Sequence, residues 1–203
     1  MVGPLIYMPW QTMGEAIDTR TQEVHPGHTE KGAFLGEPGA RLYTLSFTPS
    51  VPAGAHIIYA PPFGEEMNRC RALVAQQARA FAGRGYRCTL LDYYGTGDSE
   101  GQLEEASIDV WIENILTVAR LTAEPEVPFF LWGVRLGGTI ALELAHRHPG
   151  EFGRLLLWAP VVSGSRFITQ MLRLRIAALA SRGLPPETTA EMRERLQAGA
   201  ELD

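Results

Sequence analysis

The sequence is poor in cysteine and in positive charge, and it contains no long uncharged apolar run. Its two cysteines, Cys70 and Cys88, are too far apart for a CxxC motif, and they do not suggest a disulfide framework. The net charge of -5 argues against a nucleic-acid partner. No stretch reaches the roughly 18 apolar residues that a membrane span requires. We therefore expect reduced thiols in a cytoplasmic protein with no membrane span.

Apolar periodicity indicates that strands and helices alternate along the chain. Residues 41–48 alternate apolar and polar side chains, which is typical of a strand with one buried face, whereas residues 56–60 are more uniformly apolar and predict a central strand. Further strands are predicted at residues 87–92, 129–132 and 154–159, and helices are predicted to begin near Glu65 or Glu66, near Ser107 and near Leu136. This alternation predicts an α/β fold with a doubly wound, mostly parallel sheet.

Changes in pattern along the chain predict three regions. Residues 1–38 show no sustained periodicity and are expected to form a loosely ordered N-terminal lead. Residues 39–163 carry the strand and helix signals of the core. Residues 164–203 contain two helical patterns and no strand, so we expect a helical segment there.

Three loops follow the carboxyl ends of predicted strands, where open α/β sheets place their ligands. They cover residues 61–67, residues 93–101 and the turn at Arg135. In the third, FFLWGVRLGG (residues 129–138), an apolar run ends abruptly at Gly133 and a helical run begins at Leu136. This is the layout of a nucleophile elbow, G-x-S-x-G, but its central residue is Arg135. A guanidinium stays protonated and has no lone pair with which to attack a carbonyl.

Four segments together resemble the α/β-hydrolase superfamily. More narrowly, PPFGEEMN and the arginine-bearing elbow resemble the exosortase A system-associated hydrolase 2 group. That resemblance implies a bacterial hydrolase of the ester or acyl class, associated with an exosortase protein-sorting and exopolysaccharide system. The segments are APPFGEEMNRCR (residues 60–71), LLDYYGTGDSEG (90–101), LWGVRLGG (131–138) and LLLWAPVVSG (155–164).

The resemblance also implies where a site lies. Backbone N–H groups of Phe63 or Gly64 and of Leu136 match the superfamily's oxyanion site. The nucleophile position falls on Arg135, and the acid and histidine of a triad are expected on later strands. We therefore expect a core that is truncated at its C-terminal side, followed by the start of a helical cap, and inactive as a Ser-His-Asp hydrolase.

Arg135 has two interpretations. It is either a receptor for an anionic ligand, aided by the N-terminus of the following helix, or the partner of an internal carboxylate. Glu65, Glu66 and Asp92 are all expected at the same edge of the sheet, which favours the ion pair. Two functions follow: an ester or acyl hydrolase, or a non-catalytic relative that binds an anionic ligand or a partner protein.

No cofactor and no metal site is predicted from the sequence. A small-molecule or acyl compound is the expected ligand. The last clear strand, residues 154–159, is expected to leave one edge of the sheet unpaired. Because unpaired edges promote association, we expect either a homodimer through that edge or poor solubility.

Overall fold

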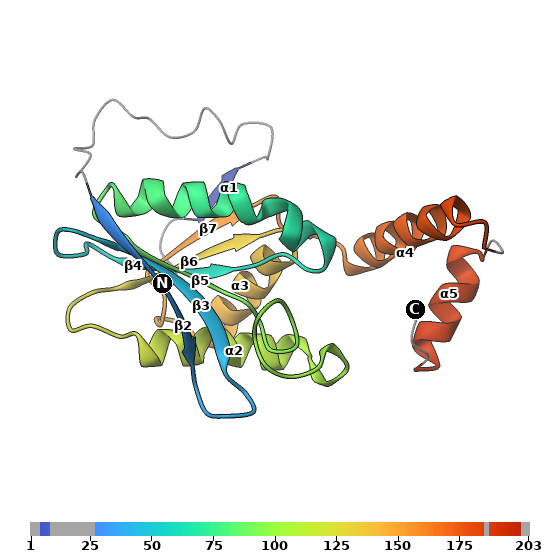
Figure 1. Cartoon of the computed structure of the whole chain (residues 1–203), viewed down its shortest axis with the longest axis horizontal. Helices are drawn as coiled ribbons and strands as arrows, with labels where there is room; N and C mark the ends of the chain where they lie inside the picture. The colour runs from blue at the N-terminus through green and yellow to red at the C-terminus, as the bar shows by residue number, and fades with distance from the viewer. Residues whose placement is uncertain (1–4, 9–26, 185–186, 200–203) are drawn as a thin grey trace. The chain divides into compact units, whose positions relative to one another are not determined.

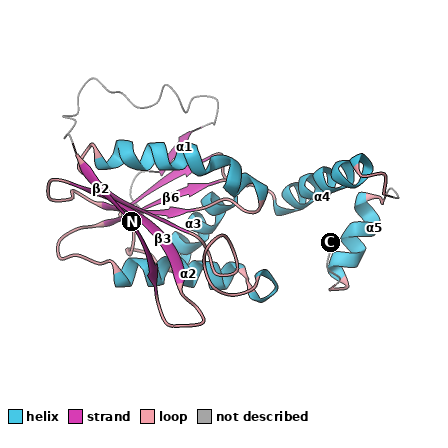
Figure 2. Ribbon diagram, viewed as in Figure 1, coloured by secondary structure: helices cyan, strands magenta, loops and turns pink. Residues whose placement is uncertain are grey.

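The structure is a computed structural model that describes residues 5–8, 27–184 and 187–199. It divides into two compact units, Met1–Pro160 and Val161–Asp203. The first unit contains the strands β1 (Leu5–Met8), β2 (His28–Leu35), β3 (Leu42–Pro49), β4 (His56–Ala60), β5 (Arg87–Leu91), β6 (Phe129–Val134) and β7 (Arg154–Trp158), with the helices α1 (Glu65–Ala82), α2 (Ile108–Leu121) and α3 (Leu136–Arg147). A short 3-10 helix, η2, covers Leu103–Glu105. Figure 2 shows the strands gathered into one sheet with helices beside it.

The seven strands form one sheet in the order β1-β7-β6-β4-β5-β3-β2. β5, β4, β6, β7 and β1 run parallel to one another, whereas β3 is antiparallel to β5 and β2 is antiparallel to β3. The mostly parallel, doubly wound sheet predicted from the sequence is therefore confirmed. The carboxyl ends of β4, β5 and β6 lie at one edge, so the three loops singled out in the sequence meet there.

The N-terminal region and the sheet edge differ from expectation. β2 lies within the expected loose lead and pairs with β3 from His28↔Pro49 to Leu35↔Leu42. Most of its side chains are exposed, as expected of an edge strand, so it carries no burial pattern. Residues 5–8 of the lead form β1, and its residues 1–4 and 9–26 lie outside the described residues. At the other edge β1 pairs with β7, so the unpaired edge on which the homodimer expectation rested is occupied by this chain itself.

Helices cover both faces of the sheet, with α1 on one face and α2 and α3 on the other (Figure 1). Neighbouring residues of β6 show why its sequence is apolar throughout. Leu131 packs on the α2 and α3 face with Ile115 and Leu144. Trp132 points to the α1 face, where its ring centroid lies 4.7 Å from that of Trp158. A parallel strand buried on both sides needs no polar alternation.

The second unit contains α4 (Gly164–Ser181) and α5 (Thr189–Gln197). A capping box at Thr188 and Glu191 begins α5, and Met192 is fully buried. Arg193 of α5 donates to Thr169 Oγ1 of α4 at 2.7 Å. None of the helices in the described ranges is long and apolar enough to cross a membrane.

Candidate functional site

The turn between β6 and α3 has the strained backbone of an elbow. Arg135 is the N-cap of α3 with φ +54° and ψ −118°, a conformation that a residue with a side chain rarely adopts. Glycine is required on both sides of it. An added Cβ at Gly133 would lie 2.5 Å from Gly138 Cα, and one at Gly137 would lie 2.0 Å from the carbonyl oxygen of Ala60. The strand and helix therefore cross too closely for larger residues.

The Arg135 side chain forms an ion pair with Glu66 in the first turn of α1. Its Nε lies 3.0 Å from Glu66 Oε1, and about a third of each side chain is exposed. Arg135 Nη1 also donates to the carbonyl oxygen of Ala159 at 3.4 Å. Of the three carboxylates considered from the sequence, the structure thus places Glu66 against Arg135, while Glu65 is exposed.

Asp92 binds a different arginine. The Arg71 Nη2 donates to both carboxylate oxygens of Asp92, at 3.2 and 3.1 Å. The backbone N–H of Asp98 donates to the same carboxylate at 3.0 Å, and Asp92 is only 5% exposed. Sequence reasoning missed Arg71 as the partner of Asp92. Helical spacing does place Arg71 on the same face of α1 as Met67. Asp92 is therefore committed to holding the loop after β5 and does not reach Arg135.

The backbone donors considered for an oxyanion-type site lie at two helix N-termini. Gly64, with φ +60°, is the N-cap of α1, and Leu136 is the first residue of α3. The N–H groups of Phe63, Gly64 and Leu136 make no hydrogen bond to any other group in the described part of the chain. The close contact of Gly137 with the Ala60 and Pro61 carbonyls brings the two segments together. Unused donors and two helix dipoles favour negative charge at this edge.

Glu66 and Cys70 complete the surroundings of the elbow on α1. Glu66 Oε2 is buried and has no hydrogen-bond partner among the residues described. Cys70, one turn further along, is a free and half-buried thiol. Burial, and then the negative charge of Glu66, raise the pKa of Cys70. The thiol is therefore protonated at neutral pH and is a poor nucleophile.

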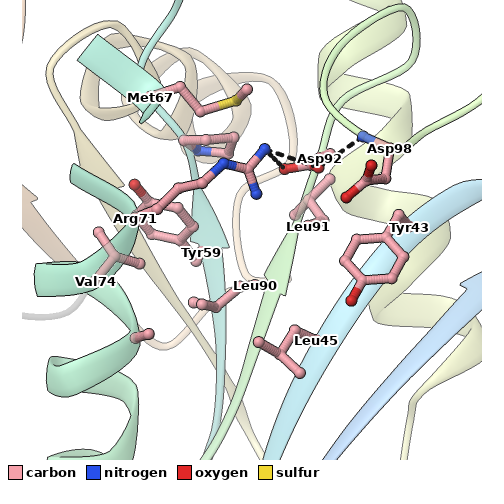
Figure 3. Close-up of a pocket in the computed structure, with 12 residues that line it drawn as sticks. Tyr43, Leu45, Tyr59, Met67, Arg71, Val74, Leu90, Leu91, Asp92 and Asp98 are labelled. Carbon is pink, nitrogen blue, oxygen red and sulfur yellow. Dashed lines mark hydrogen bonds and ion pairs between the residues drawn. The ribbon is translucent and has the colours of Figure 1, made fainter. Parts of the chain in front are cut away.

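A pocket of about 250 Å³ lies between α1 and the strands β3, β4 and β5 (Figure 3). Its wall is mostly apolar, and Arg71, Asp92 and Asp98 stand at one side of it. Arg135 does not line it, so it is distinct from the elbow. The apolar lining consists of Tyr43, Leu45, Tyr59, Pro61, Met67, Val74, Ala75, Leu90 and Leu91.

The described ranges contain no group of three or more His, Cys, Asp or Glu side chains that could hold a metal ion. Two acidic residues at this edge, Glu66 and Asp92, are instead paired with arginines.

Comparisons with known proteins identify related sequences and folds. The family model described as serine aminopeptidase, S33, matches residues 53–198. The mitochondrial palmitoyl-protein thioesterase ABHD10 of Bos taurus is 30% identical over 73% of this chain and 46% of its own length. A monoacylglycerol lipase of Mycolicibacterium smegmatis is 24% identical over 69% of this chain and 50% of its own length. The chain thus spans about half the length of these curated relatives.

Solved structures share the fold. The mouse alpha/beta hydrolase domain-containing protein 10 matches with a TM-score of 0.55 and 25% identity, covering 81% of this chain and 59% of that one. An alpha-beta serine hydrolase homologue from Coxiella burnetii matches with a TM-score of 0.57 and 20% identity, covering 68% of this chain and 66% of that one. At its identity, the second likeness concerns the fold alone.

Proposed function

This chain belongs to the serine aminopeptidase S33 family of the α/β-hydrolase superfamily, and we propose that it binds an acyl compound at the elbow without attacking it. The observation that carries the proposal is the position of Arg135. Its guanidinium stands where the superfamily places a nucleophile, on a turn with φ +54°. A guanidinium binds carboxylates and carbonyl oxygens, and it cannot form an acyl-enzyme.

The contacts of Arg135 leave donors for a ligand. Among the residues that the structure describes, Glu66 accepts from Nε, and the only other bond is the long one from Nη1 to Ala159. The remaining donors on the Nη atoms can bind a carboxylate or carbonyl oxygen together with the N–H of Leu136 and that of Phe63 or Gly64. Glu66 fixes the direction of the guanidinium and offsets its charge, so binding depends on hydrogen-bond geometry more than on net charge.

The acyl class is proposed from the relatives. Those named above are a palmitoyl-protein thioesterase and a monoacylglycerol lipase, whose names both describe acyl compounds. A fatty-acid anion presents both an acyl chain and a head group that suits Arg135. We propose it as the ligand class of the elbow.

Calorimetric titration of octanoate into the chain tests this proposal. Arg135→Ala is expected to weaken binding by at least about tenfold, the loss of one charge-assisted contact. Arg79→Ala is the control, because Arg79 is also an ion-paired arginine, lies near the other end of α1 and binds Glu30. Equal affinity of the two variants for octanoate would refute a role for Arg135 in binding.

Acyl hydrolysis is the second candidate function, and the unused N–H groups of Phe63, Gly64 and Leu136 favour it because they suit a developing oxyanion. Hydrolysis of p-nitrophenyl acetate separates the two functions. We expect the same background rate for the chain and for Arg135→Ala. Activity that Arg135→Ala abolishes would instead assign chemistry to the elbow, and activity gained in Arg135→Ser would show that an acid and a base are already in position.

A bacterial exosortase and exopolysaccharide system is the proposed setting, on the resemblance carried by PPFGEEMN and the arginine-bearing elbow. Deleting the gene is expected to change the surface display of sorted proteins or the amount of exopolysaccharide. An unchanged cell surface would remove this association and leave the binding proposal in place.

A further inference from the structure

The pocket beneath α1 combines an apolar wall with two groups of opposite charge at one side. Its volume of about 250 Å³ is slightly below the range of pockets for drug-sized ligands, which suits a small metabolite. Tyr59, Leu45 and Leu90 form part of the apolar wall, and Arg71 and Asp98 face it from α1 and from the loop after β5 (Figure 3).

Asp92 holds the Arg71 guanidinium in place through only one of its three nitrogens. Both bonds to Asp92 come from a single nitrogen, Nη2, at 3.2 and 3.1 Å. Nε and Nη1 bond to no residue in the described ranges, and a guanidinium nitrogen that does not face Asp92 points toward the apolar side chains (Figure 3). Because Asp92 holds Nη2, the Nη1 donor is already oriented for a carboxylate in the pocket.

Asp98 supplies the opposite charge. Its backbone N–H donates to Asp92 Oδ2 at 3.0 Å, which fixes the residue beside the Arg71–Asp92 pair. The side chain forms no hydrogen bond or ion pair within the part of the chain that the structure describes, and it lines the pocket. Glycine is required next to it, because a Cβ at Gly97 would lie 2.0 Å from Asp92 Oδ2. The Asp98 carboxylate and the Arg71 guanidinium therefore lie on either side of Asp92 (Figure 3).

We propose that this pocket binds a free α-amino acid with an apolar side chain, independently of the elbow. The carboxylate of the amino acid binds Nη1 of Arg71, its ammonium group binds Asp98, and its side chain lies against Tyr59, Leu45 and Leu90. Asp92 offsets the charge of Arg71, so with Asp98 the pocket carries net negative charge. A simple carboxylate would be repelled by that charge, whereas a zwitterion matches both groups.

Calorimetric titration with L-phenylalanine tests the proposal on the full chain. Two comparison ligands each lack one charge: hydrocinnamate has no ammonium group, and phenethylamine has no carboxylate. We expect L-phenylalanine to bind with a Kd of about 1 mM or tighter. Each comparison ligand is expected to bind at least about tenfold more weakly, because it loses one charge-assisted contact.

Two variants and one control locate the binding. Asp98→Asn keeps the backbone N–H that binds Asp92 and is expected to weaken L-phenylalanine binding by at least about tenfold. Ala75→Leu fills the pocket from α1 and is expected to abolish binding. Glu104→Gln removes an exposed carboxylate elsewhere on the same connecting segment and should leave the Kd unchanged. Arg71 itself is left intact, because removing it would strand the buried carboxylate of Asp92.

Three results would overturn the proposal. The first is that the folded chain does not bind L-phenylalanine. The second is that hydrocinnamate binds as tightly as L-phenylalanine, and the third is that a folded Ala75→Leu variant still binds L-phenylalanine. Thermal unfolding of each variant shows whether it is folded. The readout is separate from octanoate binding at the elbow, so failure of either proposal leaves the other standing.

Discussion

Arg135 Nε lies 3.0 Å from Glu66 Oε1 and so ties the turn after β6 to the first turn of α1. The two residues are 69 positions apart in the sequence, and both lie where parallel strands end. In this chain the centre of the elbow is therefore part of an ion pair with α1.

The ion pair between Glu66 and Arg135 is expected to contribute modestly to the free energy of unfolding. About a third of each side chain is exposed, so solvent screens the pair, and a double-mutant cycle with Glu66→Gln and Arg135→Met should give about 0.5 to 1 kcal/mol. Urea unfolding measures the four free energies. The coupling energy should decrease as salt is added. Additive effects of the two substitutions would show that the contact contributes nothing to folding.

Gly137→Ala is expected to destabilise the fold severely. The added Cβ would meet the backbone oxygen of Ala60 at 2.0 Å, and backbone cannot move aside, so a loss of at least about 3 kcal/mol is expected. Gly164→Ala is the matched control. It lies in the first turn of α4 with open space around its Cβ position, and it should change stability by less than about 1 kcal/mol. Similar melting temperatures for both variants would contradict the tight crossing of β6 and α3.

The sequence predicted the sheet well where strands are buried and poorly at its margins. Both ends of β4 were predicted correctly, because a short apolar run between turn-forming residues indicates a buried strand. β2 was missed because most of its side chains are exposed, and an edge strand can carry any polar residue. Its pairing depends on β3 rather than on its own pattern.

The candidate site was predicted to a similar extent. Topology brings Glu66, Asp92 and Arg135 to one edge, and the sequence suffices for that. Which carboxylate binds which arginine depends on side-chain reach. Asp92 binds Arg71 because both lie on the α1 face of the sheet. The periodicity of the sequence does not predict the distance between these two side chains.

Stability is expected to fall in acid because of His56. This residue is 2% exposed, and its Nε2 lies 2.8 Å from Thr89 Oγ1. Burial, with the nearby charge of Arg87, lowers the pKa of His56 from 6.5 to about 3. The unfolded chain therefore binds a proton that the folded chain excludes, and stability is complete above pH 6.5 and decreases as the pH falls toward 3.

Urea unfolding between pH 6.5 and 4.5 measures this effect, with a slope approaching about 1.4 kcal/mol per pH unit from this one group. Most of the slope above about pH 5.5 belongs to His56, because Glu100, whose pKa is lowered from 4.5 to about 2 by its hydrogen bonds with Arg41, begins to contribute as the pH approaches 4.5. His56→Gln should flatten the profile in this window. A variant that keeps the full slope would show that another group takes up the proton.

The start of α5 is expected to depend on the hydroxyl of Thr188. That hydroxyl accepts from the Glu191 N–H at 3.2 Å, and Glu191 Oε2 accepts from the Thr188 N–H at 2.7 Å, so each residue satisfies a donor that the helix leaves free. Thr188→Ala should cost about 1 kcal/mol in the stability of α5, whereas Thr188→Ser keeps the oxygen and should cost little. Amide hydrogen exchange along α5 measures the difference, because it reports local opening without requiring the whole chain to unfold. Faster exchange at Glu191 and Met192 in Thr188→Ala alone is the expected result. Equal exchange in the two variants would mean that the burial of Met192 holds the helix without its cap.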